Sequence, residues 1–176
     1  MKKATELPRR KVTHLRTYDY SQLGCYFVTI CTRDKRCLFG DIVADAMRLN
    51  AVGLLVEACW RAIENHYPNV FLDQHVVMPN HVHGIIRLCE IERSRHASPL
   101  QDKGAVPLGS VVGSFKSAVS KQLRLLPGMT GASMWQRNYY DHVIRSEASL
   151  QTIREYIVNN PKQWALDREN PQFHER

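Results

Sequence analysis

Long apolar runs, a surplus of acidic side chains and closely paired cysteines are all absent from this 176-residue sequence. No stretch approaches the roughly 20 apolar residues that a membrane-spanning helix needs. The opening MKKATELPRRK also lacks the apolar core of a signal peptide. We therefore expect a cytoplasmic protein. The five cysteines are odd in number and match no zinc-finger spacing, so we expect them to be reduced and mostly buried.

Basic side chains outnumber acidic ones, with 24 Lys and Arg against 17 Asp and Glu and a net charge of +7. This balance favours a polyanionic partner, although a merely basic soluble protein is an alternative. Much of the excess lies in residues 1–16, which we interpret as a flexible basic arm. The length and composition favour a single domain, which we place over residues 17–165 and which a tail of residues 166–176 follows.

The pattern of apolar residues predicts a mixed α+β domain. Segments rich in β-branched and aromatic residues predict strands at about 25–32, 70–78, 81–88 and 135–144. Helical spacing predicts helices at about 51–66, 108–125 and 146–160. Residues 33–50 indicate a loop with a short hairpin, and residues 89–107 an exposed, mobile loop. The first six elements, β-α-β-β-α-β, match a ferredoxin-like antiparallel sheet with helices on one face, and a C-terminal helix follows.

The most informative motif is His81-Val82-His83, inside the apolar run QHVVMPNHVHGIIRL. In a strand, residues two apart share a face, so both imidazoles could bind one metal ion. Tyr156 and Asn160 are four residues apart, so they share a face of the last predicted helix. If that helix crosses the sheet near the histidines, Asn160 could complete the metal site. Tyr156 would then lie beside an ion such as Mg²⁺ or Mn²⁺, although imidazoles also accept Zn²⁺.

A tyrosine beside a divalent cation favours chemistry on a phosphodiester. The cation neutralises charge that develops on the phosphate. A phenol with a pKa of about 10 is a poor nucleophile unless a cation or a base assists it. Attack by the tyrosine would form a phosphotyrosine link and leave a free 3′-hydroxyl. A second strand end could later attack that link, so the chemistry permits strand transfer as well as cutting.

Several motifs of the chain resemble the REP-associated tyrosine transposases, a branch of the single-tyrosine HUH transposase superfamily with an IS200-like domain. The resemblance covers about residues 16–165 and is carried by MPNHVHGII, VVGSFKS, WQRNYYDHVIR and EYIVNNP. It implies that His81 and His83 are metal ligands and that Tyr156 is the nucleophile that becomes linked to a 5′ DNA end. Asn160 matches a metal-site position that is a Gln in some relatives.

The same resemblance implies a substrate and a partner. The substrate would be single-stranded DNA with a small hairpin, as in repetitive extragenic palindromes, in a nucleoid-associated cytoplasmic protein. A divalent metal, Mg²⁺ or Mn²⁺, is implied, and no organic cofactor. Both a monomer and a homodimer are compatible with it. The residues that we expect to contact DNA are Arg9, Arg10, Lys11, Lys116, Lys121, Arg137, His142 and Arg145.

Other readings of these residues stay open on the sequence alone. Lys116 and Lys121 could be a solvated helix face, and Tyr156 could be a core tyrosine. Tyr139 and Tyr140 are rival nucleophiles because they lie near His142, but neighbouring strand residues face opposite ways, so at most one points to the site. His75 is separated from the histidine pair by the turn at Pro79-Asn80, so we do not expect it to be a ligand. Tyr26 and Trp135 are expected in the core.

Three other functions compete with a transposase. A rolling-circle replication initiator or relaxase shares the chemistry, but usually belongs to a larger protein with a helicase or a second domain. A non-catalytic binder of palindromic DNA or RNA, domesticated from a transposase, is compatible with the same fold. A structural zinc protein is disfavoured because the chain offers only two closely spaced ligands and no cysteine pairs.

Overall fold

A computed structural model of the chain describes residues 23–90, 106–125 and 134–172. The basic arm, with Arg9, Arg10 and Lys11, and most of the expected loop 89–107 lie outside these residues. Within the part that is described, no helix is long and apolar enough to cross a membrane.

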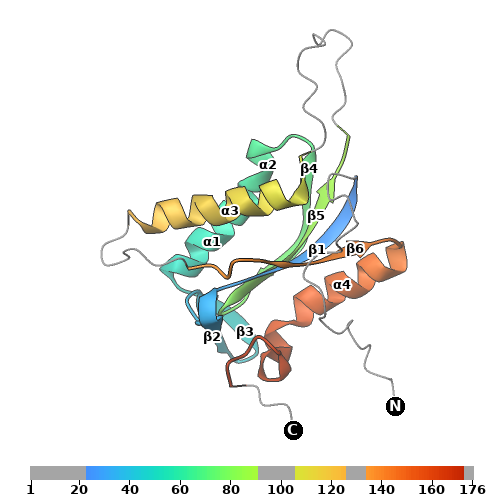
Figure 1. The fold of residues 1–176 in the computed structure, drawn as a ribbon. Helices are drawn as coiled ribbons and strands as arrows, with labels where there is room; N and C mark the ends of the chain where they lie inside the picture. Colours follow the sequence, from blue (N-terminus) through green and yellow to red (C-terminus); the bar gives the residue numbers. More distant parts are fainter. Residues whose placement is uncertain (1–22, 91–105, 126–133, 173–176) are drawn as a thin grey trace, which may run out of the picture.

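One four-stranded antiparallel sheet forms the centre of the fold (Figure 1). Its strands are β1 (Gly24–Cys31), β4 (Val70–Val77), β5 (His81–Leu88) and β6 (Tyr140–Ile144). They lie in the order β4-β5-β1-β6, and each neighbouring pair is antiparallel. With helices after β1 and β5, this order is that of a ferredoxin-like sheet, so the predicted fold class is confirmed.

Helices cover the two faces of the sheet unequally (Figure 1). On one face lie α1 (Ala51–Arg61), α2 (Ile63–His66) and α3 (Leu108–Leu123), whereas α4 (Glu147–Asn159) lies on the other. A 3₁₀ helix, η2 (Pro161–Leu166), continues directly from α4. The expected arrangement, with two crossover helices on one face and an additional C-terminal helix, is therefore present.

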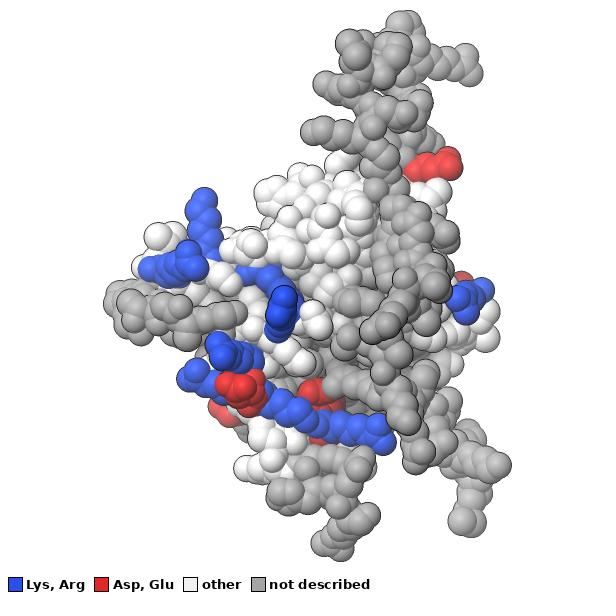
Figure 2. Space-filling model, in the orientation of Figure 1, with Lys and Arg blue, Asp and Glu red and all other residues white. Residues whose placement is uncertain are grey.

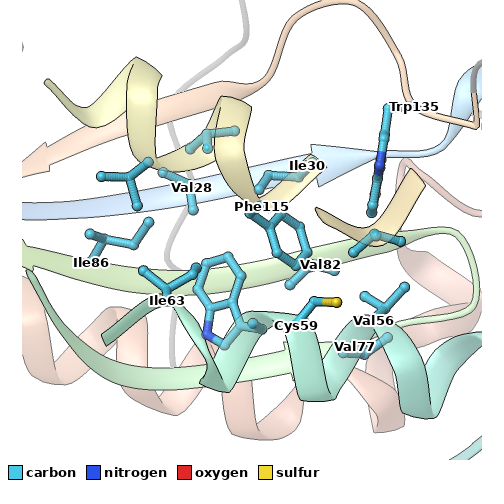
Figure 3. Packing of buried hydrophobic residues seen from close by; sticks show 14 of the residues in the cluster. Val28, Ile30, Val56, Cys59, Ile63, Val77, Val82, Ile86, Phe115 and Trp135 are labelled. Atoms are coloured by element: carbon cyan, nitrogen blue, oxygen red, sulfur yellow. The ribbon is translucent and has the colours of Figure 1, made fainter. Parts of the chain in front are cut away.

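Strict alternation along the central strands divides the apolar residues into two clusters. Tyr26, Val28 and Ile30 of β1 belong to the cluster under α1 and α3, which Figure 3 shows from close by. The intervening Phe27 belongs instead to the cluster under α4, together with Ile85 of β5. Residues of one parity thus build the larger core, and residues of the other parity face α4. Tyr26 and Trp135 are buried in the larger cluster, as expected.

The boundaries of several elements differ from the prediction. The helix expected at 51–66 is interrupted at Ala62, whose ψ of −8° departs from the α-helical value of about −42°. The strand expected at 135–144 is interrupted: Trp135 pairs with Thr32 in an isolated bridge, the chain then bends, and β6 begins at Tyr140. Within the interruption, the carbonyls of Gln136 and Asn138 accept from Lys116 Nζ. The expected short hairpin is present as β2 (Gly40–Val43) and β3 (Ala46–Leu49), after the 3₁₀ helix η1 (Arg33–Lys35).

The cysteines form no disulfide, but they are less buried than expected. Cys31 and Cys59 are buried, Cys25 and Cys89 are partly exposed, and Cys37 is exposed. The expectation that most are buried is therefore wrong, because Cys37 lies in the segment that joins η1 to β2 at the surface.

Candidate active site

The two histidines of the HVH motif lie at the beginning of β5 and face α4. His81 pairs with Cys31 and His83 pairs with Thr29 on the neighbouring strand β1. Their ring centroids are 4.3 Å apart, and the exposed fractions of the two residues are 0% and 3%. The strand alternation expected from the sequence is thus present, and both imidazoles lie on one face of the sheet.

Tyr156 meets this histidine pair from α4. Its Oη lies 3.2 Å from His83 Nε2, and the two ring centroids are 5.2 Å apart. The helix begins at Ser146, whose side chain accepts from the Ser149 amide, and the apolar residues of its inner face pack on the sheet. It therefore crosses the sheet beside β5, which is the condition that the sequence interpretation required.

An ion pair fixes α4 against the outer strand of the sheet. Arg154 Nε and Nη2 donate to the two carboxylate oxygens of Asp73 in β4, over 2.8 and 2.6 Å. The hydrogen bond from Arg154 is the largest cause that lowers the pKa of Asp73. A two-pronged contact restricts rotation as well as distance, so it helps to set the position of Tyr156 two residues further along the helix.

Each histidine is oriented by a partner on its Nδ1 side. Thr29 Oγ1 lies 2.9 Å from His83 Nδ1, and Asn80 Oδ1 lies 2.8 Å from His81 Nδ1. Asn80 Nδ2 donates to two backbone carbonyls, so the atom that faces His81 is the amide oxygen Oδ1, which can only accept. His81 Nδ1 must therefore carry a proton and donate it, and in the neutral ring Nε2 is the nitrogen that can bind a metal.

A carboxylate that the sequence interpretation did not include completes this cluster. Ligand atoms of His81, His83 and Asp167 all lie within 4.8 Å of one another, and Asp167 Oδ2 is 3.9 Å from His81 Nε2. Asp167 follows η2, in the segment that we had assigned to a tail. The sequence offered no periodic pattern that would have singled it out, because its approach depends on how the chain turns after Pro161.

Asn160, the ligand suggested by the sequence, ends α4 as its C-cap. Its residue is 1% exposed, and its Oδ1 accepts no hydrogen bond from any part of the chain that the structure describes. A buried amide oxygen without a donor is costly unless another group compensates it. The two imidazoles and the Asp167 carboxylate form a donor set that fits a divalent cation, and the buried Asn160 oxygen stays a candidate ligand.

The rival residues separate onto the two faces of the sheet. Tyr140 pairs with Thr29 and contacts Phe27 edge-on, so it lies on the face of the histidines, at the neighbouring strand β6. Tyr139 lies near Gly109 and has Lys116 Nζ 6.0 Å from its ring centroid. His75 stacks on Trp60, with centroids 5.9 Å apart, beneath α1. His75 therefore lies on the face of the sheet opposite to the histidine pair.

The expected DNA contacts have different surroundings. Lys116 Nζ donates to the carbonyls of Gln136 and Asn138, and burial lowers its pKa, so it is not simply part of a solvated face. His142 is partly buried on β6, and burial is the main cause that lowers its pKa. Among the members that the structure describes, Lys121, Arg137 and Arg145 are exposed.

Basic side chains gather on part of the face that Figure 2 shows, with Asp and Glu side chains among them. Figure 2 shows Lys and Arg concentrated where Figure 1 places the end of α3 and the β2–β3 hairpin. Exposed basic residues of this region include Arg33, Lys35 and Arg36, directly after β1, whose last residue Cys31 pairs with His81. Positive charge thus begins only a few residues from the histidine pair.

Comparison with known proteins agrees with the motifs. No protein-family model matches the chain. A Haemophilus influenzae protein described only as uncharacterized is 41% identical over 166 residues, which are 90% of this chain and 91% of that protein. Another H. influenzae protein, provisionally named a REP-associated tyrosine transposase, is 22% identical over 147 residues, covering 81% of this chain and 73% of that protein.

The fold has a counterpart among solved structures. A REP-associated tyrosine transposase bound to a REP hairpin superposes with a TM-score of 0.59 at 19% identity, covering 86% of this chain and 74% of the other. The chain therefore has the α+β fold of a transposase. Its resemblance to the REP-associated tyrosine transposases, predicted from the motifs, is confirmed.

Proposed function

We propose that this protein is a metal-dependent single-stranded DNA endonuclease and strand transferase of the REP-associated tyrosine transposase type. The observation that carries the proposal is the approach of Tyr156 Oη to within 3.2 Å of His83 Nε2, beside a buried His-His-Asp cluster. A tyrosine that served only the core would have no need of a cluster of metal-binding groups at its hydroxyl. Similarity of motifs and fold to REP-associated transposases points in the same direction.

Tyr156 would act as the nucleophile. Its phenolic oxygen attacks the phosphorus of a phosphodiester, forms a Tyr–O–P bond at the 5′ side and breaks the bond to the 3′ oxygen. The phenolic proton is in net terms transferred to that 3′ oxygen, which leaves as a hydroxyl. Attack of a 3′-hydroxyl on the phosphotyrosine link reverses the cleavage reaction: it breaks the Tyr–O–P bond and joins two strands.

His81 and His83 would hold the divalent cation, Mg²⁺ or Mn²⁺, with Asn160 as a further candidate ligand. When bound, the cation supplies charge stabilisation for the anionic phosphate and assists deprotonation of a phenol. The protein's own contribution is orientation: Thr29 and Asn80 fix the two imidazoles, and the Asp73–Arg154 pair fixes the helix of Tyr156.

The substrate that we propose is single-stranded DNA that folds into a small palindromic hairpin. A structural relative is bound to a REP hairpin, and a net charge of +7 favours a polyanion. Exposed Lys121, Arg137 and Arg145 are candidates for phosphate contacts, and Arg9, Arg10 and Lys11 remain candidates outside the described residues.

Covalent trapping tests the proposal. Hairpin oligonucleotides with single-stranded flanks, taken from short palindromes beside the coding sequence and labelled at their 3′ ends, are incubated with the protein and Mn²⁺ or Mg²⁺ and separated on a denaturing gel. We expect a labelled protein–DNA adduct that EDTA prevents. Tyr156→Phe should remove the adduct while changing hairpin affinity by less than about twofold, because a single hydroxyl contributes little to phosphate-dominated binding.

Tyr140→Phe is the matched control, because Tyr140 lies on the same face of the sheet. That variant should form the adduct as the parent protein does. Normal cutting by Tyr156→Phe would refute the proposed nucleophile. Hairpin binding without an adduct from any variant, with either metal, would support the non-catalytic binder instead.

A further inference from the structure

We propose that Asp167 is a metal ligand, so that the segment after the last helix forms part of the metal centre together with His81 and His83. The inference deepens the proposed function and rests on its metal site. Asp167 was assigned from the sequence to a tail, whereas the structure brings it to the histidines. Its carboxylate would add the only formally charged ligand to a set that otherwise consists of neutral imidazole nitrogens and an amide oxygen.

The three proposed ligands lie close together in an enclosed part of the protein. The ligand atoms of the three residues lie within 4.8 Å of one another, close to the spacing across one ion with metal–ligand bonds of about 2.1–2.3 Å. The side chains of His81 and Asp167 are 0% and 8% exposed. This enclosure distinguishes the cluster from the exposed acidic groups that are common on protein surfaces.

The hydrogen bond between His81 and Asn80 determines which ring nitrogen faces Asp167. Because Nδ1 donates to Asn80 Oδ1, the opposite nitrogen, Nε2, is the one that faces Asp167 Oδ2 across 3.9 Å. That distance exceeds a hydrogen bond, which would require about 2.7–3.2 Å. Two groups with lone pairs that face each other in a buried place are the arrangement expected of ligands on either side of a cation.

The carboxylate of Asp167 is also held in place from its other side. Its Oδ1 accepts the backbone N–H of Glu169 over 2.7 Å, which turns Oδ2 toward the histidine. A ligand oriented by a backbone donor loses little conformational entropy when it binds an ion. A carboxylate in so enclosed a position also gains more from a nearby divalent cation than an exposed one would.

Further contacts attach the segment of Asp167 to the histidine side of the sheet. Asn80 donates to the Glu169 carbonyl, and Lys35 Nζ lies 3.8 Å from the Glu169 carboxylate. Trp164 of η2 has its ring centroid 6.1 Å from that of His81. One side chain, Asn80, thus orients His81 and anchors the segment that carries Asp167, so metal binding and docking of that segment should stabilise each other.

Titration of the purified full-length protein with MnCl₂ in a calorimeter tests the inference without DNA. Asp167→Asn nearly preserves shape and removes the charge, and we expect at least about a tenfold loss of Mn²⁺ affinity, in the range that metal-site variants show. Asp45→Asn, an exposed carboxylate in the β2–β3 turn, is the matched control and should bind Mn²⁺ as the parent does. The His81→Ala/His83→Ala double variant should show no binding at this site.

Thermal unfolding provides a second readout. In EDTA, the Asp167→Asn variant and the parent should melt within a few degrees of each other, and Mn²⁺ should raise the melting temperature of the parent more than that of the variant. A loss of less than about tenfold in affinity, while the double histidine variant loses binding, would overturn the role of Asp167 and leave the histidine site intact. Parent-like binding by the double variant would overturn both. The expected Mn²⁺ pattern without any DNA adduct would refute the proposed function alone.

Discussion

Gly84 of β5 lies on the face of the sheet that packs against Trp60, and no side chain fits at this position. A Cβ at this residue would overlap the indole ring of Trp60, which is fully buried. Gly84→Ala should therefore lower the free energy of unfolding by about 1–3 kcal/mol, the usual cost of overpacking a core. Urea unfolding monitored by circular dichroism measures the change.

Gly113 on α3 serves as the opposite control, because a Cβ there meets nothing within 4 Å. Gly113→Ala should raise the free energy of unfolding by up to about 1 kcal/mol, since alanine loses less backbone entropy in a helix. Equal stability of Gly84→Ala and the parent would show that Trp60 can move aside, and that the packing behind the histidines is not rigid.

Among single residues, those that could be predicted from the sequence are residue types that rarely occur in such surroundings. His81, His83 and Tyr156 stand out because an imidazole pair in an apolar strand and a phenol before Asn160 have few ordinary reasons to occur together. Their partners Thr29, Asn80 and Asp167 are common residue types in common positions. Only the tertiary fold, which joins β1, a turn and the chain after η2, brings those three to the histidines.

Helix α4 depends on charge as well as on apolar packing for its position. Because the pKa of Asp73 is lowered in the folded protein, chiefly by the hydrogen bond from Arg154, its ionised form stabilises the fold. That contribution is complete above the unfolded pKa of about 3.9 and is lost as pH falls through the lower folded pKa. Asp73→Asn should therefore be less stable than the parent at neutral pH, by about 0.5–1 kcal/mol, with the difference vanishing in acid.

Urea unfolding of both proteins at several pH values between about 3 and 7 tests this prediction. Glu147→Gln is the control, because Glu147 is 81% exposed and approaches Arg154 only to 3.5 Å, so its removal should change little. A stability difference that stays constant across the whole range would mean that Asp73 contributes by shape and not by charge.

Among the elements, those with a clear period were predicted best. β5 was placed correctly at 81–88, and α3 and α4 within a few residues of their ends. The helix break at Ala62 and the late beginning of β6 were not predictable, since no Pro or Gly marks either place. Before β6, the bend after Trp135 is accompanied by a contact between elements distant in sequence, because Lys116 of α3 donates to the Gln136 and Asn138 carbonyls.

The molecule as a whole contains all parts of the proposed site in one chain, because Tyr156 meets His83 of its own sheet. A dimer that exchanged α4 would instead combine the tyrosine of one subunit with the histidines of the other. Mixing Tyr156→Phe with the His81→Ala/His83→Ala variant therefore discriminates the two arrangements. We expect no adduct with hairpin DNA from the mixture, because neither chain has a complete site.

The mixture should be tested after joint refolding as well as after simple mixing, so that slow exchange of subunits cannot hide complementation. Recovery of adduct in either case would mean that α4 is shared between chains. Size-exclusion chromatography of the parent protein, run in parallel, relates the outcome to the number of subunits.

The register of β5 has a consequence for how such sequences can diverge. Val82, Gly84 and Ile86 face the larger core and alternate with the residues that face α4. The site therefore depends on each residue of β5 staying on its own face of the sheet. An insertion of one residue between His83 and Gly84 would move both imidazoles to the face of the sheet that Trp60 covers. An insertion of two residues would return them to the face of α4. Length variation among descendants of this chain should therefore collect in the β2–β3 hairpin and other loops, and the spacing from the histidines to the glycine should stay free of it.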